Sequence, residues 1–255
     1  MEVGDVMTIY YEDESVVLHH GDWRTEIPSD FRADLILTDP PYGETSLTWD
    51  RWPADWPNMA ARYSDSMWCF GSMRMFLDRR DDFRVWRLSQ DIVWRKNRGS
   101  GFATDRFARI HEHVTHWYQG DWSKVHHETP RVPRTGPAKY VTRRASSPHT
   151  GAISNDVPYV DDGLRLTPSV LDHRNMQGTG PINPTQKPVP ILEPLIQYGC
   201  PVGGTVLDLF AGSGSTLVAA RNLGRKAVGY EVREEQCETT ALRLSQGVLD
   251  FGDAS

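Results

Sequence analysis

Four consecutive residues place an acid, two prolines and an aromatic ring directly after an apolar run: "DPPY", residues 39–42, following "ADLILT". The Asp39 carboxylate and the Pro40 carbonyl can each accept one hydrogen of an amine, and the Tyr42 ring can stack on a planar group. Proline fixes φ and restricts the residue before it, so both acceptors would be held rigidly. The alternative is an ordinary strand-ending turn, in which Pro-Pro is common and Asp caps the next segment.

A second segment, "TVLDLFAGSGSTLVAA" (205–220), reads as a strand, a glycine turn and a helix. Gly212 and Gly214 permit a sharp turn and a close approach by a ligand, and the helix N-terminus attracts polar or anionic groups. Glu231 ends the next predicted strand 19 residues after Gly212, where its carboxylate can accept both hydroxyls of a ribose. This spacing predicts a nucleoside-bearing cofactor. The alternatives are a tight turn without a ligand and a nicotinamide site, although Leu217 stands where the nicotinamide pattern has its third glycine.

The remaining pattern predicts the elements that would carry these groups. Short runs rich in β-branched and aromatic residues predict strands, proline-tolerant apolar spacing predicts a helix at 187–199, and helical spacing recurs near 58–65. Tryptophan-rich 47–57 reads as a loop. The predicted strands are 7–11, 15–20, 33–39, 67–72, 91–96, 111–120 and 205–209, with a further strand that ends at Glu231. Alternating strands and helices, with a strand apolar throughout, predict an α/β fold with a mostly parallel sheet.

Bulk properties limit the class of protein. The chain has 255 residues and a net charge of −6, with no apolar stretch near the roughly 20 residues that span a bilayer. The acidic start lacks a signal core, so we expect a soluble, cytosolic protein. Its three cysteines form no CxxC pair, and "HEHVTH" (111–116) has Thr115 where the HExxH zinc motif needs histidine, so no metal site is expected.

Basic residues concentrate in the middle of the chain despite the negative total. Between Asp121 and Thr150 six Lys or Arg residues face two acids, and more arginines lie just upstream. From Gly120 to about Pro184 apolar runs give way to Pro, Gly, Ser and Thr, which predicts a loop-rich insertion. The basic stretch favours phosphate contact and base recognition over the alternative of a solvated loop.

The sequence motifs resemble those of one known family. "LDLFAGSGSTLVAA" is similar to the S-adenosylmethionine motif of amino-methylating DNA methyltransferases, and "TDPPYG" to their catalytic motif. The catalytic motif comes first, as in the β arrangement of the adenine-N6 and cytosine-N4 enzymes. "HHGDW", "IVWRKN", "FARIHEHV" and "NPTQKPVPILEPLI" resemble further motifs, although Asn183 replaces the usual histidine. The resemblance implies a doubly wound, Rossmann-like α/β sheet with circularly permuted motif order, divided into a catalytic half (1–119), a target-recognition insertion (120–182) and a cofactor half (183–255).

The resemblance also implies roles for individual residues. The catalytic residues would be Asp39, Pro40, Pro41 and Tyr42. Contacts with S-adenosyl-L-methionine would come from Asp22 at the adenine, Glu231 at the ribose, Thr185 and Lys187 at the methionine carboxylate, and Asp208, Phe210, Gly212, Gly214, Ser215 and Thr216 around the turn. We predict DNA contacts for Arg95, Lys96, Arg98, Lys124, Arg131, Arg134, Lys139, Arg143 and Arg144.

The resulting expectation is an S-adenosylmethionine-dependent methyltransferase acting on a flipped base in double-stranded DNA. Adenine N6 is favoured over cytosine N4 because cytosine-N4 relatives more often carry Ser in place of the leading Asp39. A nicotinamide oxidoreductase and a catalytically inactive DNA-binding module are the rival classes. A homodimer and a cognate restriction endonuclease are open partners. Trp49, Trp52 and Trp56 would either close over the flipped base or pack in the core.

Overall fold

The computed structural model describes residues 8–96, 105–134, 162–173 and 186–246. The chain divides into a larger compact unit, Met1–Glu128 with Ser169–Ser255, and a smaller one, Thr129–Pro168. Each unit is described below by itself. No described helix is long and apolar enough to cross a membrane.

The larger unit is built on one nine-stranded sheet with the order β1-β2-β11-β10-β3-β4-β6-β5-β9. Five neighbouring strands, from β2 to β4 in this order, run parallel, while β1 and β6 are antiparallel to their neighbours. The strands are β1 (Thr8–Glu12), β2 (Val16–His20), β3 (Leu35–Thr38), β4 (Ser66–Gly71), β5 (Arg87–Arg95), β6 (His111–Tyr118), β9 (Val170–Asp172), β10 (Thr205–Asp208) and β11 (Lys226–Glu231).

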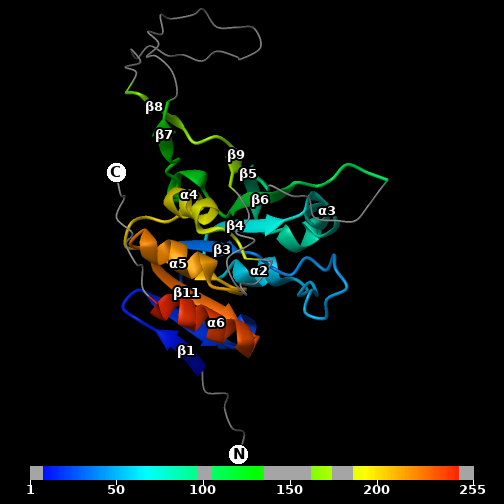
Figure 1. Cartoon of the computed structure of the whole chain (residues 1–255), viewed down its shortest axis with the longest axis vertical. Helices are drawn as coiled ribbons and strands as arrows, with labels where there is room; N and C mark the ends of the chain where they lie inside the picture. Colours follow the sequence, from blue (N-terminus) through cyan, green and yellow to red (C-terminus); the bar gives the residue numbers. More distant parts are fainter. Residues whose placement is uncertain (1–7, 97–104, 135–161, 174–185, 247–255) are drawn as a thin grey trace, which may run out of the picture. The chain divides into compact units, whose positions relative to one another are not determined.

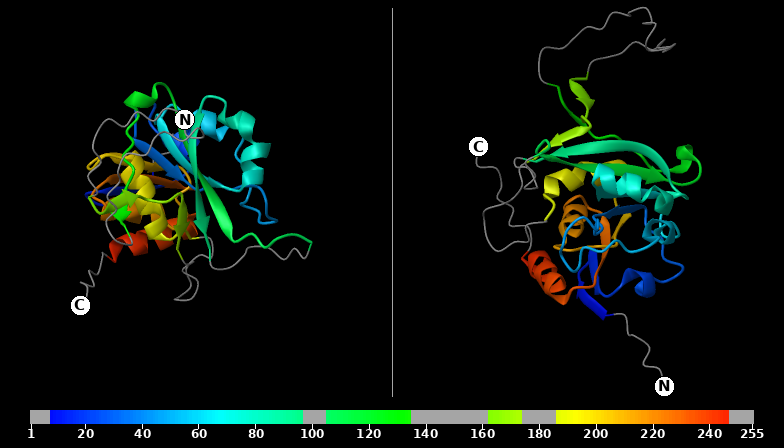
Figure 2. Two further views of the ribbon diagram at one scale, coloured as in Figure 1. Left: turned by 90° about the horizontal axis from the view of Figure 1, so that it is seen from above. Right: turned by 90° about the vertical axis from the view of Figure 1, so that its right-hand side faces the viewer.

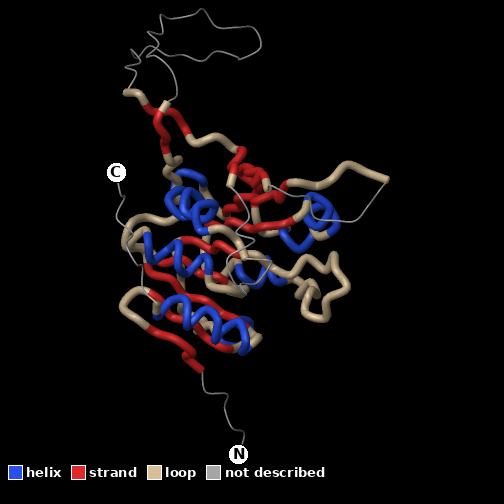
Figure 3. Tube along the Cα trace, in the orientation of Figure 1, coloured by secondary structure: helices blue, strands red, loops and turns tan. Residues whose placement is uncertain are grey.

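Helices cover both faces of this sheet, as the cartoon and the tube show (Figures 1 and 3). Figure 2 shows α2 and α3, in cyan, on the opposite side of the sheet from α4, α5 and α6, in yellow to red. The helices are α1 (Trp23–Glu26), α2 (Trp56–Ala60), α3 (Met73–Asp78), α4 (Val189–Gly199), α5 (Ser215–Asn222) and α6 (Glu234–Ser245), with short 3-10 turns η1 (Arg80–Phe83) and η2 (Trp122–Lys124). The mostly parallel, doubly wound sheet predicted from the sequence is therefore confirmed.

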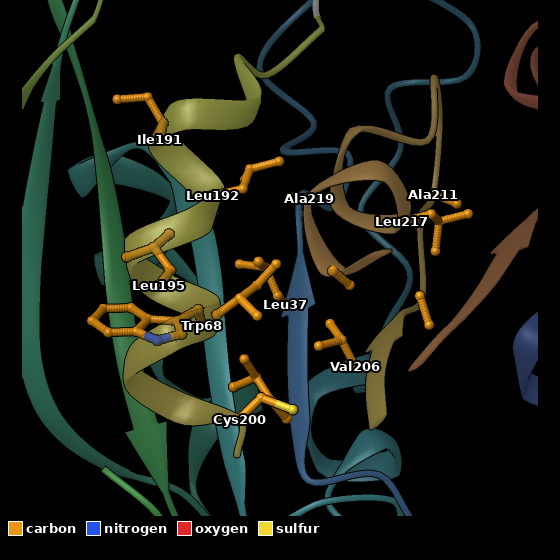
Figure 4. Close-up of a cluster of buried hydrophobic side chains, with 14 of the residues drawn as sticks. Leu37, Trp68, Ile191, Leu192, Leu195, Cys200, Val206, Ala211, Leu217 and Ala219 are labelled. Atoms are coloured by element: carbon orange, nitrogen blue, oxygen red, sulfur yellow. The ribbon is translucent and has the colours of Figure 1, made fainter. Parts of the chain in front are cut away.

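Alternation along the central strands creates two hydrophobic cores. Successive side chains of a strand point to opposite faces, so Leu35 and Leu37 of β3 pack under α4 while Ile36 packs on the other side with Trp56 of α2. Figure 4 shows Leu37 lying with Trp68 of β4 and with side chains of α4. Both faces of β3 are fully buried, which explains its uninterrupted apolar sequence.

The parallel strands end at one edge of the sheet, and the predicted functional motifs follow them there. β3 and β10 are adjacent, although Asp39 and Thr205 lie 166 positions apart in the sequence. From this pair the chain continues outward in opposite directions, through β4 on one side and β11 on the other. Ligands of open α/β sheets bind at such a switch point, outside the carboxyl ends of the strands.

One predicted helix is wrong in its position. Helical spacing predicts a helix near 58–65, whereas α2 begins at Trp56, one residue before the end of the expected loop, and ends at Ala60. The Ser64 hydroxyl accepts a hydrogen bond from the Ser66 amide (3.1 Å) and donates to the Asp34 carbonyl (3.2 Å). Serine side chains that bind nearby backbone compete with helix formation, and here they lead the chain into β4.

The smaller unit contains a two-stranded antiparallel sheet, β7 (Arg131–Pro133) with β8 (Leu164–Leu166). The expected insertion, 120–182, extends beyond this unit at both ends, because η2 and β9 belong to the larger unit. β9 lies beside β5 as an edge strand that the loop-rich sequence does not predict.

Candidate active site

Asp39 is the first residue after β3 and has both carboxylate oxygens engaged. The Tyr42 hydroxyl donates a hydrogen bond to Oδ1 (2.7 Å), and the Lys187 ammonium forms an ion pair with Oδ2. The Asp39 side chain remains 30% exposed, so a ligand can reach it. Burial, followed by the nearby Asp39 charge, raises the pKa of Tyr42 above its ordinary value, which keeps its hydroxyl a hydrogen-bond donor.

The loop after the catalytic motif is organised by an acid that sequence reasoning missed. Asp50 is 3% exposed and accepts hydrogen bonds from the backbone amides of Gly43 (2.7 Å) and Thr45 (2.7 Å). Burial would raise the pKa of Asp50, but these hydrogen bonds outweigh it and lower the pKa. Gly43 has φ +72°, a conformation that favours glycine. The only signal in the sequence is an acid placed seven residues after this glycine.

The glycine turn follows β10 and has the predicted backbone. Gly212 has φ +50° and Gly214 has φ +72°, and Ser215 then begins α5. A methyl group added at Gly214 would lie 2.4 Å from Thr240 Cγ2, so this position has no room for a side chain. At Gly212 the same group would meet nothing closer than 3.9 Å, which leaves space beside the turn for a ligand.

Glu231 lies beside the glycine turn at the end of β11. Its side chain is 7% exposed, and Oε2 accepts a hydrogen bond from the Gly212 amide (2.8 Å) while Oε1 accepts from the Arg233 amide (2.9 Å). Asp22 follows β2, the strand that pairs with β11, and it caps α1 while pairing with Arg24. The two predicted nucleoside-binding acids thus occupy neighbouring strand ends.

A buried hydrogen bond joins the two halves of the site. Thr38, which precedes the catalytic motif, donates to Asp208 Oδ1 (2.9 Å) at the end of β10. Asp208 also accepts from the Phe210 amide (3.1 Å) and from Thr216. Burial raises the pKa of Asp208 to about 6, while these hydrogen bonds act in the opposite direction. Asp39 and the glycine turn therefore lie at the same edge, on adjacent strands, as the sequence interpretation requires.

Other predicted cofactor residues lie around this junction. Ser215 and Thr216 are buried in the first turn of α5, where Ser215 Oγ accepts a hydrogen bond from Arg243 (3.0 Å). Phe210 is half-buried and its ring lies edge-on to Trp56, with centroids 5.4 Å apart. Thr185 lies outside the described residues.

Lys187 is placed at the catalytic carboxylate. Its ammonium pairs with Asp39, although the family resemblance predicts a contact with the methionine carboxylate. Burial alone would lower the pKa of Lys187, but the carboxylates of Asp39 and Glu112 outweigh it and raise the pKa above its ordinary value. Lys187 is therefore a cation throughout the neutral range.

The three tryptophans after the catalytic motif have different environments. Trp56 is fully buried, and Trp52 packs against it with ring centroids 5.7 Å apart, so both belong to the core. Trp49 is 41% exposed and stacks on the Arg233 guanidinium at 4.9 Å, next to Glu231.

The predicted DNA contacts differ in how accessible they are. Lys96 is only 11% exposed, and its ammonium pairs with Glu112. Arg95 is 59% exposed and paired with Asp172, and Lys124 is exposed in η2. In the smaller unit Arg131 pairs with Asp162, and Arg134 follows β7. Arg98, Lys139, Arg143 and Arg144 lie outside the described residues.

The cysteines and histidines form no metal centre within the described parts of the chain. No group of three or more His, Cys, Asp or Glu side chains there is arranged to hold an ion. Cys69, Cys200 and Cys237 are buried and free, and "HEHVTH" lies on β6 rather than on a helix.

Comparison with known proteins agrees with this geometry. The chain is 26% identical over 264 residues to the Type II methyltransferase M.ScaI of Streptomyces caespitosus, covering 92% of this chain and 83% of the relative. It is 46% identical to the putative methylase YubD of Escherichia coli K12, over 25% of this chain and 28% of that protein.

Solved structures show the same fold. The complex of M1.HpyAVI with SAM matches with a TM-score of 0.61 at 22% identity, covering 89% of this chain and 99% of the other. The PvuII DNA methyltransferase, described as cytosine-N4-specific, matches with a TM-score of 0.63 at 16% identity, over 97% and 91% of the two chains. The sequence model of the N6_N4_Mtase family, DNA methylase, matches residues 33–242, which span both strand-end motifs, and the chain therefore belongs to this family of DNA methylases.

Proposed function

We propose that this DNA methylase transfers a methyl group from S-adenosylmethionine to the exocyclic N6 amine of an adenine flipped out of double-stranded DNA. The observation that carries the proposal is the Thr38–Asp208 hydrogen bond (2.9 Å), which joins the strand before Asp39 to the strand before the glycine turn. A bound methyl donor and an amine held at Asp39 would therefore meet at one edge of the sheet.

The chemistry of the amine explains why acceptors are needed. The lone pair of an exocyclic amine is delocalised into the ring, which makes the nitrogen a poor nucleophile. Hydrogen bonds from its two N–H groups to Asp39 and to the Pro40 carbonyl favour a pyramidal nitrogen, with the lone pair directed at the methyl group. Each Asp39 oxygen has a second lone pair beyond those used by Tyr42 and Lys187, so the carboxylate can still accept.

The groups around the glycine turn suit the cofactor. When bound, S-adenosylmethionine supplies a methyl group on a positively charged sulfur. Glu231 would accept the ribose hydroxyls in exchange for its contact with Arg233, and Asp22 would bind the adenine of the cofactor. The open space at Gly212 and the N-terminus of α5 leave room for the rest of the molecule. Phe210, Ser215 and Thr216 would line the same space.

Access to the target base requires base flipping. An amine in a paired base cannot reach Asp39, and extrusion costs a few kcal/mol. Stacking on the Tyr42 ring would return roughly 1–3 kcal/mol. In the structure the hydroxyl of Tyr42 is tied to Asp39, which would hold the ring in a fixed orientation beside the acceptors.

A second candidate is methylation of cytosine N4. It is favoured by the likeness to the cytosine-N4-specific PvuII enzyme, at a TM-score of 0.63. The two acceptors at Asp39 and Pro40 fit either exocyclic amine, and the leading aspartate motivates the preference for adenine.

The functional division of the chain is part of the proposal. We assign catalysis to residues 1–119, target recognition to 120–182 and cofactor binding to 183–255, with DNA phosphates contacted by the arginines and lysines predicted above. The family resemblance also motivates two proposed partners: a second copy of the chain in a homodimer, and a cognate restriction endonuclease.

A methylation assay tests the function directly. Incubating the protein with S-adenosylmethionine carrying a tritiated methyl group and unmethylated DNA, followed by digestion to nucleosides, should place the label in N6-methyl-2′-deoxyadenosine. Label in N4-methyl-2′-deoxycytidine would select the second candidate. Absence of label in any nucleoside, with DNA still bound, would identify a DNA-binding module without activity.

A further inference from the structure

Four charged side chains of alternating sign extend from the catalytic carboxylate into the sheet. Asp39 pairs with Lys187, Lys187 Nζ lies 3.4 Å from Glu112 Oε2, and Glu112 pairs through its other oxygen with Lys96. These residues come from four places in the sequence: the end of β3, the segment before α4, the start of β6 and the end of β5.

The topology explains why they meet. β6 runs antiparallel to both β4 and β5, with Gly71 opposite His113 and Trp94 opposite Glu112. The start of β6 therefore lies at the edge where the parallel strands end, and where the catalytic motif follows β3. A glutamate at this position faces the same edge of the sheet as Asp39.

The three members of this charged cluster other than Asp39 are nearly buried. Only 10% of the Lys187 side chain, 15% of Glu112 and 11% of Lys96 are exposed. Both cations lie near aromatic rings, with Lys187 Nζ 5.1 Å from the centroid of Phe70 and Lys96 Nζ 5.0 Å from that of Trp94. Buried charges are costly unless they are paired, so each member depends on its neighbours.

Glu112 is the only member that pairs with two cations. Burial would raise the pKa of Glu112, but Lys187 and Lys96 outweigh it and lower the pKa. Without this carboxylate, Lys187 would keep a single anionic partner, Asp39, and would lie near the uncompensated charge of Lys96.

We propose that Glu112 is a positioning residue for methyl transfer: it holds Lys187 against Asp39 Oδ2, so that the catalytic carboxylate presents its free lone pairs to the target amine in a fixed orientation. Tyr42 fixes Oδ1 from the other side (2.7 Å). This assignment rests on the proposed function and adds a residue to it. It also assigns Lys187 to the groups around the catalytic carboxylate.

The test uses Glu112→Gln, which keeps the shape of the side chain and removes its charge. The single-turnover rate of methyl transfer should fall about ten- to a hundredfold because the acceptor is misplaced, while the dissociation constant for S-adenosylmethionine stays within about threefold. Glu14→Gln is the matched control: the same change in the exposed β1–β2 turn, at the opposite edge of the sheet, should leave the rate unchanged.

The pH dependence separates positioning from a structural role. In the wild type both carboxylates raise the pKa of Lys187, so its charge persists well into the alkaline range. Loss of Glu112 removes one raising charge while burial remains, so the pKa of Lys187 falls. The rate of Glu112→Gln should therefore decline at a lower alkaline pH than that of the wild type.

A double variant distinguishes tethering from charge balance. Glu112→Gln with Lys96→Gln restores the net charge of the cluster but not the tether to Lys187, so its rate should stay low. Recovery of the rate in the double variant would show that Glu112 only neutralises Lys96, and would overturn the proposal. Glu112→Asp, which keeps the charge but shortens the side chain, should give an intermediate rate and replaces Glu112→Gln if that variant does not fold.

Different results would refute the proposed function and the proposed role of Glu112. A wild-type protein that transfers no methyl group would refute the proposed function itself. An active wild type whose Glu112→Gln and Glu112→Asp variants match it in rate and pH profile would refute the role of Glu112 alone.

Discussion

At the scale of residues, the site is defined by the hydrogen-bond and ion-pair partners that the carboxylate oxygens of Asp39 already have. Asp39 receives one partner on each carboxylate oxygen, from Tyr42 and Lys187. The residue type and the two prolines identify the acceptor from the sequence. Its partners come from residues 3 and 148 positions away, and only the first is a local pattern.

Asp208 gives a prediction about stability and pH. Its pKa is about 6 in the folded protein because of burial, against about 3.9 in an unfolded chain. The folded state therefore binds the proton more tightly. The contribution is fully present below about pH 4 and is lost as pH rises through 6, amounting to about 2–3 kcal/mol.

Comparison with Asp208→Asn isolates this effect. The difference in the free energy of unfolding between wild type and variant, measured by urea denaturation, should change between about pH 4 and 6 and level off above about 7. The wild type should lose stability relative to the variant over that interval. A difference that is constant with pH would mean that Asp208 is ionised with an ordinary pKa in the fold.

At the scale of elements, the glycine turn fixes the start of α5 against α6. The position of Gly214 combines a positive φ with contact to Thr240, whose hydroxyl donates to the Gly212 carbonyl (2.9 Å). Gly203 has a similar φ of +78° but no atom within 4 Å of an added methyl group. A comparison of alanine substitutions at these two glycines therefore distinguishes the effect of backbone strain from the effect of steric crowding.

Gly214→Ala should therefore be more damaging than Gly203→Ala. Both incur roughly 1–2 kcal/mol of backbone strain, but only the first displaces Thr240 and distorts the turn. We expect Gly203→Ala to bind S-adenosylmethionine normally and Gly214→Ala to bind at least about tenfold more weakly, by calorimetric titration. Equal affinities would exclude the turn from the cofactor site.

Sequence patterns predicted the central strands because burial on both faces leaves a continuous apolar run, as in β3 and β4. The α5 region was predictable from its glycines. α2 was misplaced because the Ser64 side chain, which bonds to the Asp34 carbonyl and the Ser66 amide, holds the chain after Ala60 out of a helix, and hydrophobic periodicity ignores such bonds. β9 has three residues and depends on pairing with β5, which no local pattern encodes.

At the scale of the whole molecule, the catalytic motif and the glycine turn lie far apart in the chain but on adjacent strands of one sheet. β3 and β10 pair in space although the chain forms β4, β5, β6 and the smaller unit between them. The sequence showed both motifs and, through the family resemblance, their adjacency. It did not show Thr38–Asp208, Asp50 or Glu112, because each acts through contacts made only after folding.

DNA binding by the basic stretch is a prediction at this scale. Replacing Arg143 and Arg144 by alanine should weaken binding and reduce the slope of log affinity against log salt by about 2, since each lost phosphate contact releases about 0.9 fewer counterions. Replacing Arg32 and Arg62, which precede β3 and β4 at the edge of the sheet away from Asp39, should leave the slope unchanged. An unaltered slope in the first variant would remove both arginines from the phosphate contacts.

The central claim is that Asp39 acts on the amine and not on the cofactor, and Asp39→Ala tests it most directly. The single-turnover rate of methyl transfer to DNA and the dissociation constant for S-adenosylmethionine are measured on the same preparation. We predict that the rate falls at least about a hundredfold while the dissociation constant stays within about threefold. A variant that still methylates at the wild-type rate, or that loses cofactor binding instead, would contradict the account.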